Sequence, residues 1–220
     1  MIVSNQADLV KESQRLIIKI GSALLVNSET GEIRFNWLEK LADDIANLRS
    51  REKEVIIVSS GAVAFGSRHL GIHAKALKLQ EKQAAAATGQ IRLAYSYENA
   101  LNKHGVTIAQ ILLSPDDTEQ RRRHLNARAT ISTLLSLNVV PIINENDTVT
   151  TKELRFGDND RLGARVAQMV SADTLILLSD VDGLYNGDPR LDKTAHHIPI
   201  VKEITSEIEA MAGVATTNYS

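Results

Sequence analysis

Short apolar runs alternate with longer amphipathic segments along the chain, and this alternation restricts the possible folds more than any other feature. The runs cover residues 15–20, 55–58, 106–113, 139–143 and 174–178. Their hydrophobicity is continuous rather than alternating, which suits strands covered on both faces of a parallel sheet. The segments between them, residues 36–51, 77–104 and 120–137, are long enough to form helices. The order therefore predicts an α/β fold built from βαβ units with right-handed crossovers.

The length of 220 residues fits one large α/β domain or two small ones. The sequence contains no internal repeat, low-complexity tract or Gly/Ser-rich linker, so we expect residues 1–220 to form one domain. In the first predicted helix, Leu38, Leu41, Ile45 and Leu48 recur at helical spacing and should face the sheet. Residues 84–87 are all alanine, which allows a close backbone contact, for example with a second subunit, or simply favours helix formation.

The composition excludes several classes of protein. With no cysteine, the chain has no disulfide framework, thiolate nucleophile or zinc–thiolate site. A net charge of −2 gives no reason to expect nucleic acid as a partner. No apolar run approaches the ~20 residues of a membrane span. The first residues lack the basic start and apolar core of a signal peptide, so we expect a cytoplasmic protein without membrane contact.

A dense polar segment, residues 144–160, follows the fourth apolar run and precedes a predicted helix at 161–170. It holds three aspartates, two glutamates and three asparagines. In open parallel sheets the carboxyl ends of the strands bind ligands. Crowded carboxylates at such an edge require compensating cations, amines or hydrogen-bond donors. The segment therefore predicts a site for a small polar substrate and a phosphate-handling step.

Glycine-containing turns follow three of the predicted strands, at residues 19–22, 59–62 and 179–183. Glycine lets the backbone approach a ligand, and N–H groups at a following helix start can hold an anion. Gly61 and Gly66 have the spacing of a P-loop, but Ser67 and Arg68 follow them, which excludes a Walker A motif. No G-x-G-x-x-G follows the first strand.

Lys19 lies inside an otherwise apolar predicted strand. Burying a lysine is costly unless its ammonium group emerges at the edge of the sheet and meets an anion. The alternative is a lysine that extends to solvent with no functional role.

Two clusters of basic residues are assigned no function. Residues 121–124 (R-R-R-H) are expected on a solvated helix face. His196 and His197 lack a third metal ligand and are expected at the surface.

Eight segments, running in order from residue 17 to 190, resemble the amino acid kinase family. They are I-I-K-I-G-S, V-S-S-G-A-V-A-F-G, K-Q-A-A-A-A-T-G-Q, L-N-A-R-A-T, V-P-I-I-N-E-N-D, F-G-D-N-D, L-L-S-D-V-D-G-L-Y and D-P-R. N-E-N-D followed by F-G-D-N-D resembles the branch that phosphorylates the side-chain carboxylate of L-glutamate, the first step of proline biosynthesis. The resemblance implies a three-layer α/β/α sandwich with a mainly parallel central sheet. It also implies ATP and L-glutamate as substrates.

The resemblance also implies roles for individual residues. Lys19 would neutralise the phosphates and Asp160 would organise that lysine as a second catalytic residue. The residues implied to bind glutamate are Ser60, Gly61, Asp147 and Asn159. Those implied to bind ATP, besides Lys19, are Gly21, Ser179 and Asp180, with Tyr185, Asp188 and Pro189 on a covering loop. Mg²⁺ would be bound mainly through ATP phosphates and water, so no protein metal ligand is predicted.

Residues 148–156 resemble a segment that senses proline as a feedback inhibitor, with Glu153 as a contact, and a homo-oligomer is implied. In the family a T-G-G-M-x-T-K segment with a second catalytic lysine comes next, but the sequence ends at Ser220. We therefore expect the C-terminal part of the sandwich to be missing and residues 1–220 alone to be a poor kinase. Two alternatives remain open: another amino acid kinase, or a non-catalytic module that binds glutamate or proline.

Overall fold

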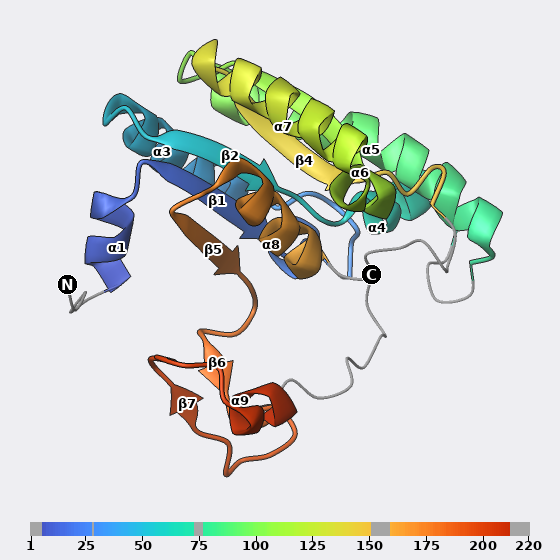
Figure 1. Ribbon diagram of the computed structural model, residues 1–220. Helices are drawn as coiled ribbons and strands as arrows, with labels where there is room; N and C mark the ends of the chain where they lie inside the picture. The colour runs from blue at the N-terminus through green and yellow to red at the C-terminus, as the bar shows by residue number, and fades with distance from the viewer. Residues whose placement is uncertain (1–5, 28, 73–76, 151–158, 212–220) are drawn as a thin grey trace.

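A five-stranded sheet forms the centre of the molecule (Figure 1). The computed structural model describes residues 6–27, 29–72, 77–150 and 159–211. The strand order is β3-β4-β2-β1-β5, and every neighbouring pair is parallel. The strands are β1 (Arg15–Ile20), β2 (Glu54–Val58), β3 (Ile108–Leu113), β4 (Val140–Glu145) and β5 (Thr174–Leu178). The predicted parallel α/β sheet is confirmed.

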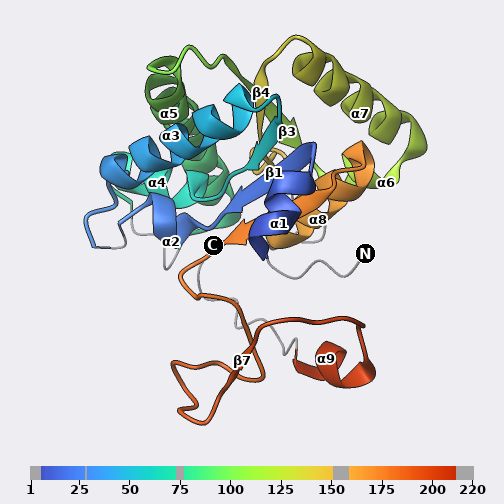
Figure 2. The ribbon, with the colours of Figure 1, turned by 90° about the vertical axis from the view of Figure 1, so that its left-hand side faces the viewer.

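Helices cover both faces of this sheet and complete three layers (Figure 2). One layer contains α2 (Ser22–Leu25), α3 (Phe35–Ser50), α4 (Ala62–His69) and α5 (Leu79–Asn102). The opposite layer contains α6 (Pro115–Glu119), α7 (Arg121–Ser136) and α8 (Asn159–Val170), and α1 (Gln6–Glu12) precedes β1. The fold is therefore the expected α/β/α sandwich.

Two hydrophobic clusters lie on opposite faces of the sheet. Ile18 and Ile20 of β1 pack with α3 and α5, whereas Ile17 packs with α7 and α8. This alternation along one strand buries both faces, which explains the continuous apolar runs in the sequence. Leu38, Leu41 and Ile45 of α3 are buried, and Leu48 packs against the same cluster, as their helical spacing predicts.

The end of β4 differs from the sequence prediction. The strand continues two residues past the expected end at 143, because Asn144 pairs with Leu112 and Glu145 with Leu113 of β3. Ladder hydrogen bonds use backbone groups, so a polar side chain does not by itself end a strand. As a result Asn144 and Glu145 are only 2% and 3% exposed.

The small residues of α5 allow a close contact with α4 of the same chain. A Cβ atom on Gly66 of α4 would lie 1.8 Å from the carbonyl oxygen of Ala85. A Cβ atom on Gly89 of α5 would lie 1.8 Å from the carbonyl oxygen of Ala62. Ala85 and Ala86 are fully buried in this crossing. The backbone that approaches the alanine run is therefore α4 of the same chain.

The segment after β5 extends away from the sandwich in both views (Figures 1 and 2). It contains the antiparallel pair β6 (Leu184–Tyr185) and β7 (His197–Ile198), followed by α9 (Ser206–Met211). Among the described residues, no helix is both long and apolar enough to span a membrane.

Candidate active site

The three glycine turns lie on one edge of the sheet, because the strands they follow, β1, β2 and β5, are parallel. The N–H of Gly21 donates a hydrogen bond to the carbonyl of Leu178, 3.0 Å away, which ties the β1 turn to the end of β5. A Cβ atom on Gly21 would lie 3.3 Å from that carbonyl oxygen. Gly61 immediately precedes α4 and has a φ of 95°, a conformation that favours glycine.

Lys19 meets a carboxylate at this edge. The residue is 7% exposed, and its Nζ lies 2.6 Å from Oδ1 of Asp160 at the start of α8. The aliphatic part of the lysine passes Gly163 of α8, where an added Cβ would lie 3.6 Å from the lysine Cβ. The Lys19 ammonium group is therefore held by an ion pair with Asp160 and does not simply extend into solvent.

Asn159 connects three elements at the same edge. Its Nδ2 lies 2.6 Å from the carbonyl oxygen of Ser59, 3.0 Å from Oγ of Ser60 and 3.0 Å from Oδ1 of Asn144. An amide NH₂ has two hydrogens, so these three acceptors share them. Asn159 begins α8, Ser59 and Ser60 follow β2, and Asn144 belongs to β4. The structure thus brings the predicted residues Ser60 and Asn159 together.

Asn144 belongs to the candidate site, although the sequence analysis did not single it out from the polar segment. Its Oδ1 also accepts the N–H of Glu145 at 2.9 Å, whereas its buried Nδ2 has no hydrogen-bond partner among the described residues. A buried donor without a partner costs about 1–3 kcal/mol, which a bound acceptor would recover. The available signal was its position at the start of N-E-N-D, directly after the apolar run.

Asp147 lies half-buried in the turn after β4. The rest of the polar segment, residues 151–158 with Glu153 and most of F-G-D-N-D, lies outside the described residues. The predicted proline-sensing role of residues 148–156 therefore stays a prediction.

The residues expected to bind ATP are only partly assembled. Ser179 and Asp180 are exposed after β5, and the Ser179 hydroxyl donates to Oδ1 of Asp180 at 3.2 Å. Asp180 also pairs with Arg190, whose Nη1 lies 3.5 Å from Oδ2 of Asp180. The Arg190 guanidinium bonds Asp188 as well, and these hydrogen bonds hold the pKa of Asp188 below its ordinary value.

Tyr185, Asp188 and Pro189 lie in the segment that extends from the sandwich, so the structure does not bring them beside Lys19 (Figures 1 and 2). The Tyr185 hydroxyl donates to Oδ1 of Asp182 at 2.8 Å. Its ring lies edge-to-face against His197, with 5.4 Å between ring centres.

The two clusters set aside in the sequence behave largely as expected. The arginines at 121–123 and both His196 and His197 are exposed. His124 differs, because it is half-buried with its Nδ1 3.1 Å from the carbonyl oxygen of Thr118. Among the described residues, no group of three or more histidine, aspartate or glutamate side chains is arranged to hold a metal ion.

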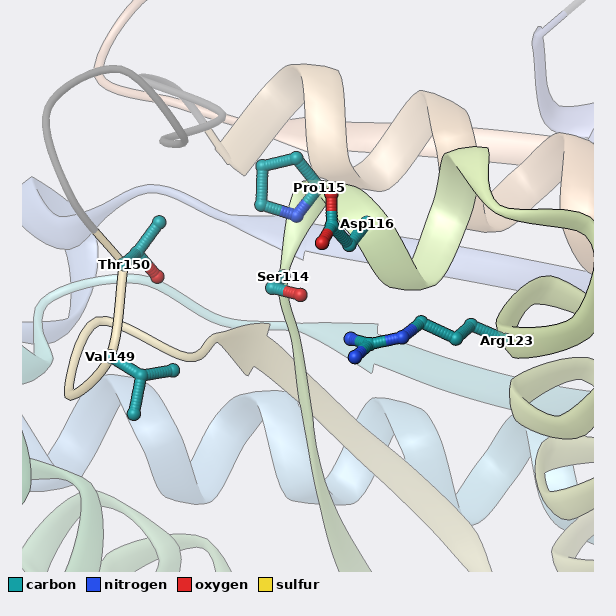
Figure 3. A pocket seen from close by; sticks show the side chains of 6 residues that line it. All are labelled: Ser114, Pro115, Asp116, Arg123, Val149 and Thr150. Carbon is teal, nitrogen blue, oxygen red and sulfur yellow. The ribbon is translucent and has the colours of Figure 1, made fainter.

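A cavity of about 160 Å³ lies at the ends of β3 and β4 (Figure 3). The residues that line it are Ser114, Pro115, Asp116, Arg123, Val149 and Thr150. Burial alone would raise the pKa of neighbouring Asp117, but hydrogen bonds from Ser114 and the Arg123 guanidinium outweigh this and lower it. The cavity contains neither Lys19 nor Asn159. We place the candidate active site at Lys19 and Asn159, where the lysine ammonium group lies on the same sheet edge as the Asn159 and Asn144 side-chain amides.

Comparison with known proteins agrees with this geometry. The sequence model of the amino acid kinase family matches residues 14–216. The chain is 64% identical to glutamate 5-kinase of Paramagnetospirillum magneticum over 94% of its own length and 56% of that protein. It is 56% identical to glutamate 5-kinase of Gluconobacter oxydans over 100% of its length and 58% of that protein. The chain therefore spans somewhat more than half the length of these curated relatives.

Two solved structures share the fold. The match to isopentenyl phosphate kinase has a TM-score of 0.64 and 16% identity, and covers 90% of this chain and 83% of that one. The match to UMP kinase from Bacillus anthracis has a TM-score of 0.56 and 17% identity, and covers 84% and 72%. Together with the family match over residues 14–216, the parallel sandwich shows that the chain belongs to the amino acid kinase family.

Proposed function

We propose that the protein containing this chain is a glutamate 5-kinase, which phosphorylates the side-chain carboxylate of L-glutamate with ATP. One structural observation carries the proposal: the ion pair between the buried Lys19 and Asp160 lies on the same sheet edge as the amide cluster of Asn159. Curated relatives of that name at 56–64% identity support the choice of substrate. We also propose that the described sandwich is one domain, since both hydrophobic clusters share its sheet.

The chemistry requires positioning and charge neutralisation more than reactive side chains. A carboxylate oxygen of glutamate attacks the γ-phosphorus of ATP, a new O–P bond forms, and the bond to the β-phosphate oxygen breaks to release ADP. The attacking carboxylate is already ionised near pH 7, so no general base has to remove a proton. This explains why a site with a lysine and amides, but no cysteine nucleophile, suffices.

Lys19 suits the phosphate side of this reaction. Its ammonium group would neutralise the phosphate oxygens and the transferring phosphoryl group, while Asp160 fixes its position 2.6 Å away. The absence of a side chain at Gly21, where a Cβ would lie 4.0 Å from Nζ of Lys19, leaves the backbone open to a phosphate. We propose that Ser179 and Asp180 line the ATP site.

We propose that Tyr185, Asp188 and Pro189 cover bound ATP. Mg²⁺ would be held mainly by the phosphates and water, and it would neutralise phosphate charge when bound.

The amide cluster suits the glutamate side. Ser60 and Asn159 present polar groups from two elements, with the backbone of Gly61 beside them. The Nδ2 of Asn144, which has no hydrogen-bond partner among the described residues, is a donor suited to a carboxylate oxygen. Asp147 would pair with the α-ammonium group. Aspartate is one methylene shorter, so it would leave one of these buried groups unpaired.

The test measures ADP release by the full natural protein that contains this chain, with glutamate and with aspartate. We expect kcat/KM to be at least ~10-fold higher for glutamate, since an unpaired buried group costs about 1–3 kcal/mol. Lys19→Met should lower kcat by ~10²-fold or more through loss of a preorganised charge. Lys40→Met, at an exposed lysine of α3, is the matched control and should retain normal kcat.

Equal kcat/KM for the two amino acids would refute the assignment of glutamate. A folded Lys19→Met protein with most of its activity would refute the catalytic role of the lysine.

A further inference from the structure

Tyr97 of α5 places a hydroxyl group inside the apolar core, in contact with Ser59 of the turn between β2 and α4. The side chain is fully buried in the cluster that joins α3 and α5 to the sheet. Its hydroxyl lies 3.1 Å from Oγ of Ser59. Burial raises the pKa of Tyr97 despite the opposing effect of this hydrogen bond, so the phenol stays protonated at neutral pH. The hydroxyl groups of Tyr97 and Ser59 therefore form a hydrogen bond inside the core.

Ser59 links Tyr97 to the candidate active site. Ser59 is fully buried, and its N–H donates to the carbonyl of Ile143 at 2.8 Å. Its own carbonyl accepts Nδ2 of Asn159 at 2.6 Å. The next residue, Ser60, supplies a second acceptor to Asn159. A shift of the Ser59 backbone would therefore move both of these acceptors together.

Two other polar residues on α5 lie on the same face as Tyr97. Gln83, Gln90 and Tyr97 are seven residues apart, a spacing that returns to nearly the same side of a helix. Nε2 of Gln90 lies 3.4 Å from the carbonyl oxygen of Glu145, at the end of β4. Nε2 of Gln83 lies 3.4 Å from the carbonyl oxygen of Thr150. One helix face thus contacts the segments after both β2 and β4.

The position of α5 is itself fixed. The crossing at Gly66 and Gly89 brings its backbone against α4, which starts at the end of the Ser59–Gly61 turn. Of the three polar contacts, the one from Tyr97 is the shortest and the most buried.

We propose that Tyr97 is a positioning residue for the glutamate side of the active site, acting through Ser59 on Ser60 and Asn159. This inference rests on the proposed glutamate kinase function. Without the phenol hydroxyl, Oγ of Ser59 would keep its long hydrogen bond, 3.4 Å, to the carbonyl oxygen of Ser60, and the turn would shift to shorten it. Such a shift would disturb the amide cluster that binds glutamate while leaving Lys19 and its ion pair with Asp160 in place.

The test replaces Tyr97 with phenylalanine in the full natural protein, which removes the hydroxyl and keeps the ring. We expect the KM for glutamate to rise about three- to tenfold, the range of one net hydrogen bond. The KM for ATP should stay within about twofold, because Lys19 is unaffected. Calorimetry with glutamate should show a matching loss of affinity. Tyr95→Phe is the matched control, since Tyr95 is on the same helix and 62% exposed.

A second variant separates positioning from a general loss of stability. If Tyr97 acts through Ser59, the double variant Tyr97→Phe/Ser59→Ala should bind glutamate no more weakly than Ser59→Ala alone. Normal glutamate binding by Tyr97→Phe, or an equal rise in both KM values, would overturn the inference and leave the proposed function intact. A wild-type protein that neither binds nor phosphorylates glutamate would overturn both.

Discussion

The crossing of α4 and α5 leads to a prediction whose size follows from the structure. Alanine at Gly66 would place its Cβ 1.8 Å from the oxygen and 2.7 Å from the carbon of the Ala85 carbonyl group. Both atoms belong to backbone and cannot rotate away. The two helices would have to separate by roughly 1.5 Å to restore van der Waals contact. This separation would also loosen the packing of Val63, Ala85 and Ala86, which form a small cluster of their own.

Two opposing effects set the magnitude of the change in stability. Alanine is favoured over glycine inside a helix by ~1 kcal/mol. Overpacking typically costs about 1–3 kcal/mol, and here the displaced atoms are backbone, so the upper end applies. We therefore expect Gly66→Ala to lower the free energy of unfolding by about 2 kcal/mol, and the Tm by about 5 °C.

Gly163→Ala is the matched control for this measurement. Gly163 is also a helical glycine, but its added Cβ would lie 3.5 Å from Leu175 Cδ1 and 3.6 Å from Lys19 Cβ, which are ordinary contacts. This variant should be neutral or more stable by up to ~1 kcal/mol. Urea unfolding of both variants and the wild-type protein provides the comparison. Equal stability of the two variants would show that the α4–α5 crossing can relax, and would refute the reasoning.

Two further predictions concern the start of β1 and a response to proline. Oδ2 of Asp173 accepts the N–H groups of Arg15 and Gln14 at 2.7 and 2.8 Å, and these hydrogen bonds lower the pKa of Asp173 below its ordinary value. A lowered pKa stabilises the fold above about pH 4, and this contribution disappears as the pH falls through the folded-state pKa. Asp173→Ala should therefore lower the free energy of unfolding by about 1 kcal/mol at pH 7, a value that allows for the exposure of Asp173. In urea unfolding, the difference in stability between this variant and the wild-type protein should be smaller at pH 3. A difference that does not depend on pH would contradict this. We also propose, from the family resemblance, that proline raises the apparent KM for glutamate and that Glu153→Ala weakens this effect; steady-state kinetics without any proline effect would exclude it.

The sequence alone determined the elements of the fold and the family. Every predicted strand and helix in the described residues is present within a few positions, because apolar runs and helical spacing report which side of an element is buried. The same reasoning placed Leu38, Leu41 and Ile45 against the sheet. Lys19 stood out because an ammonium group inside an apolar strand requires an anion, and Asp160 is that anion. Each of these signals comes from residues that are close together in the chain, so a single sequence is enough to recognise it.

Only the tertiary structure decided which elements meet. The hydrogen bond from Asn159 joins residues 100 positions apart, and the bond between Tyr97 and Ser59 joins residues 38 apart. Both depend on the order of the strands and on the helices that cover them. Periodicity shows that a residue is buried but not which side chain faces it. For this reason three features could be found only once the layers were assembled: the buried Asn144 Nδ2 without a partner among the described residues, the close α4–α5 crossing and the role inferred for Tyr97.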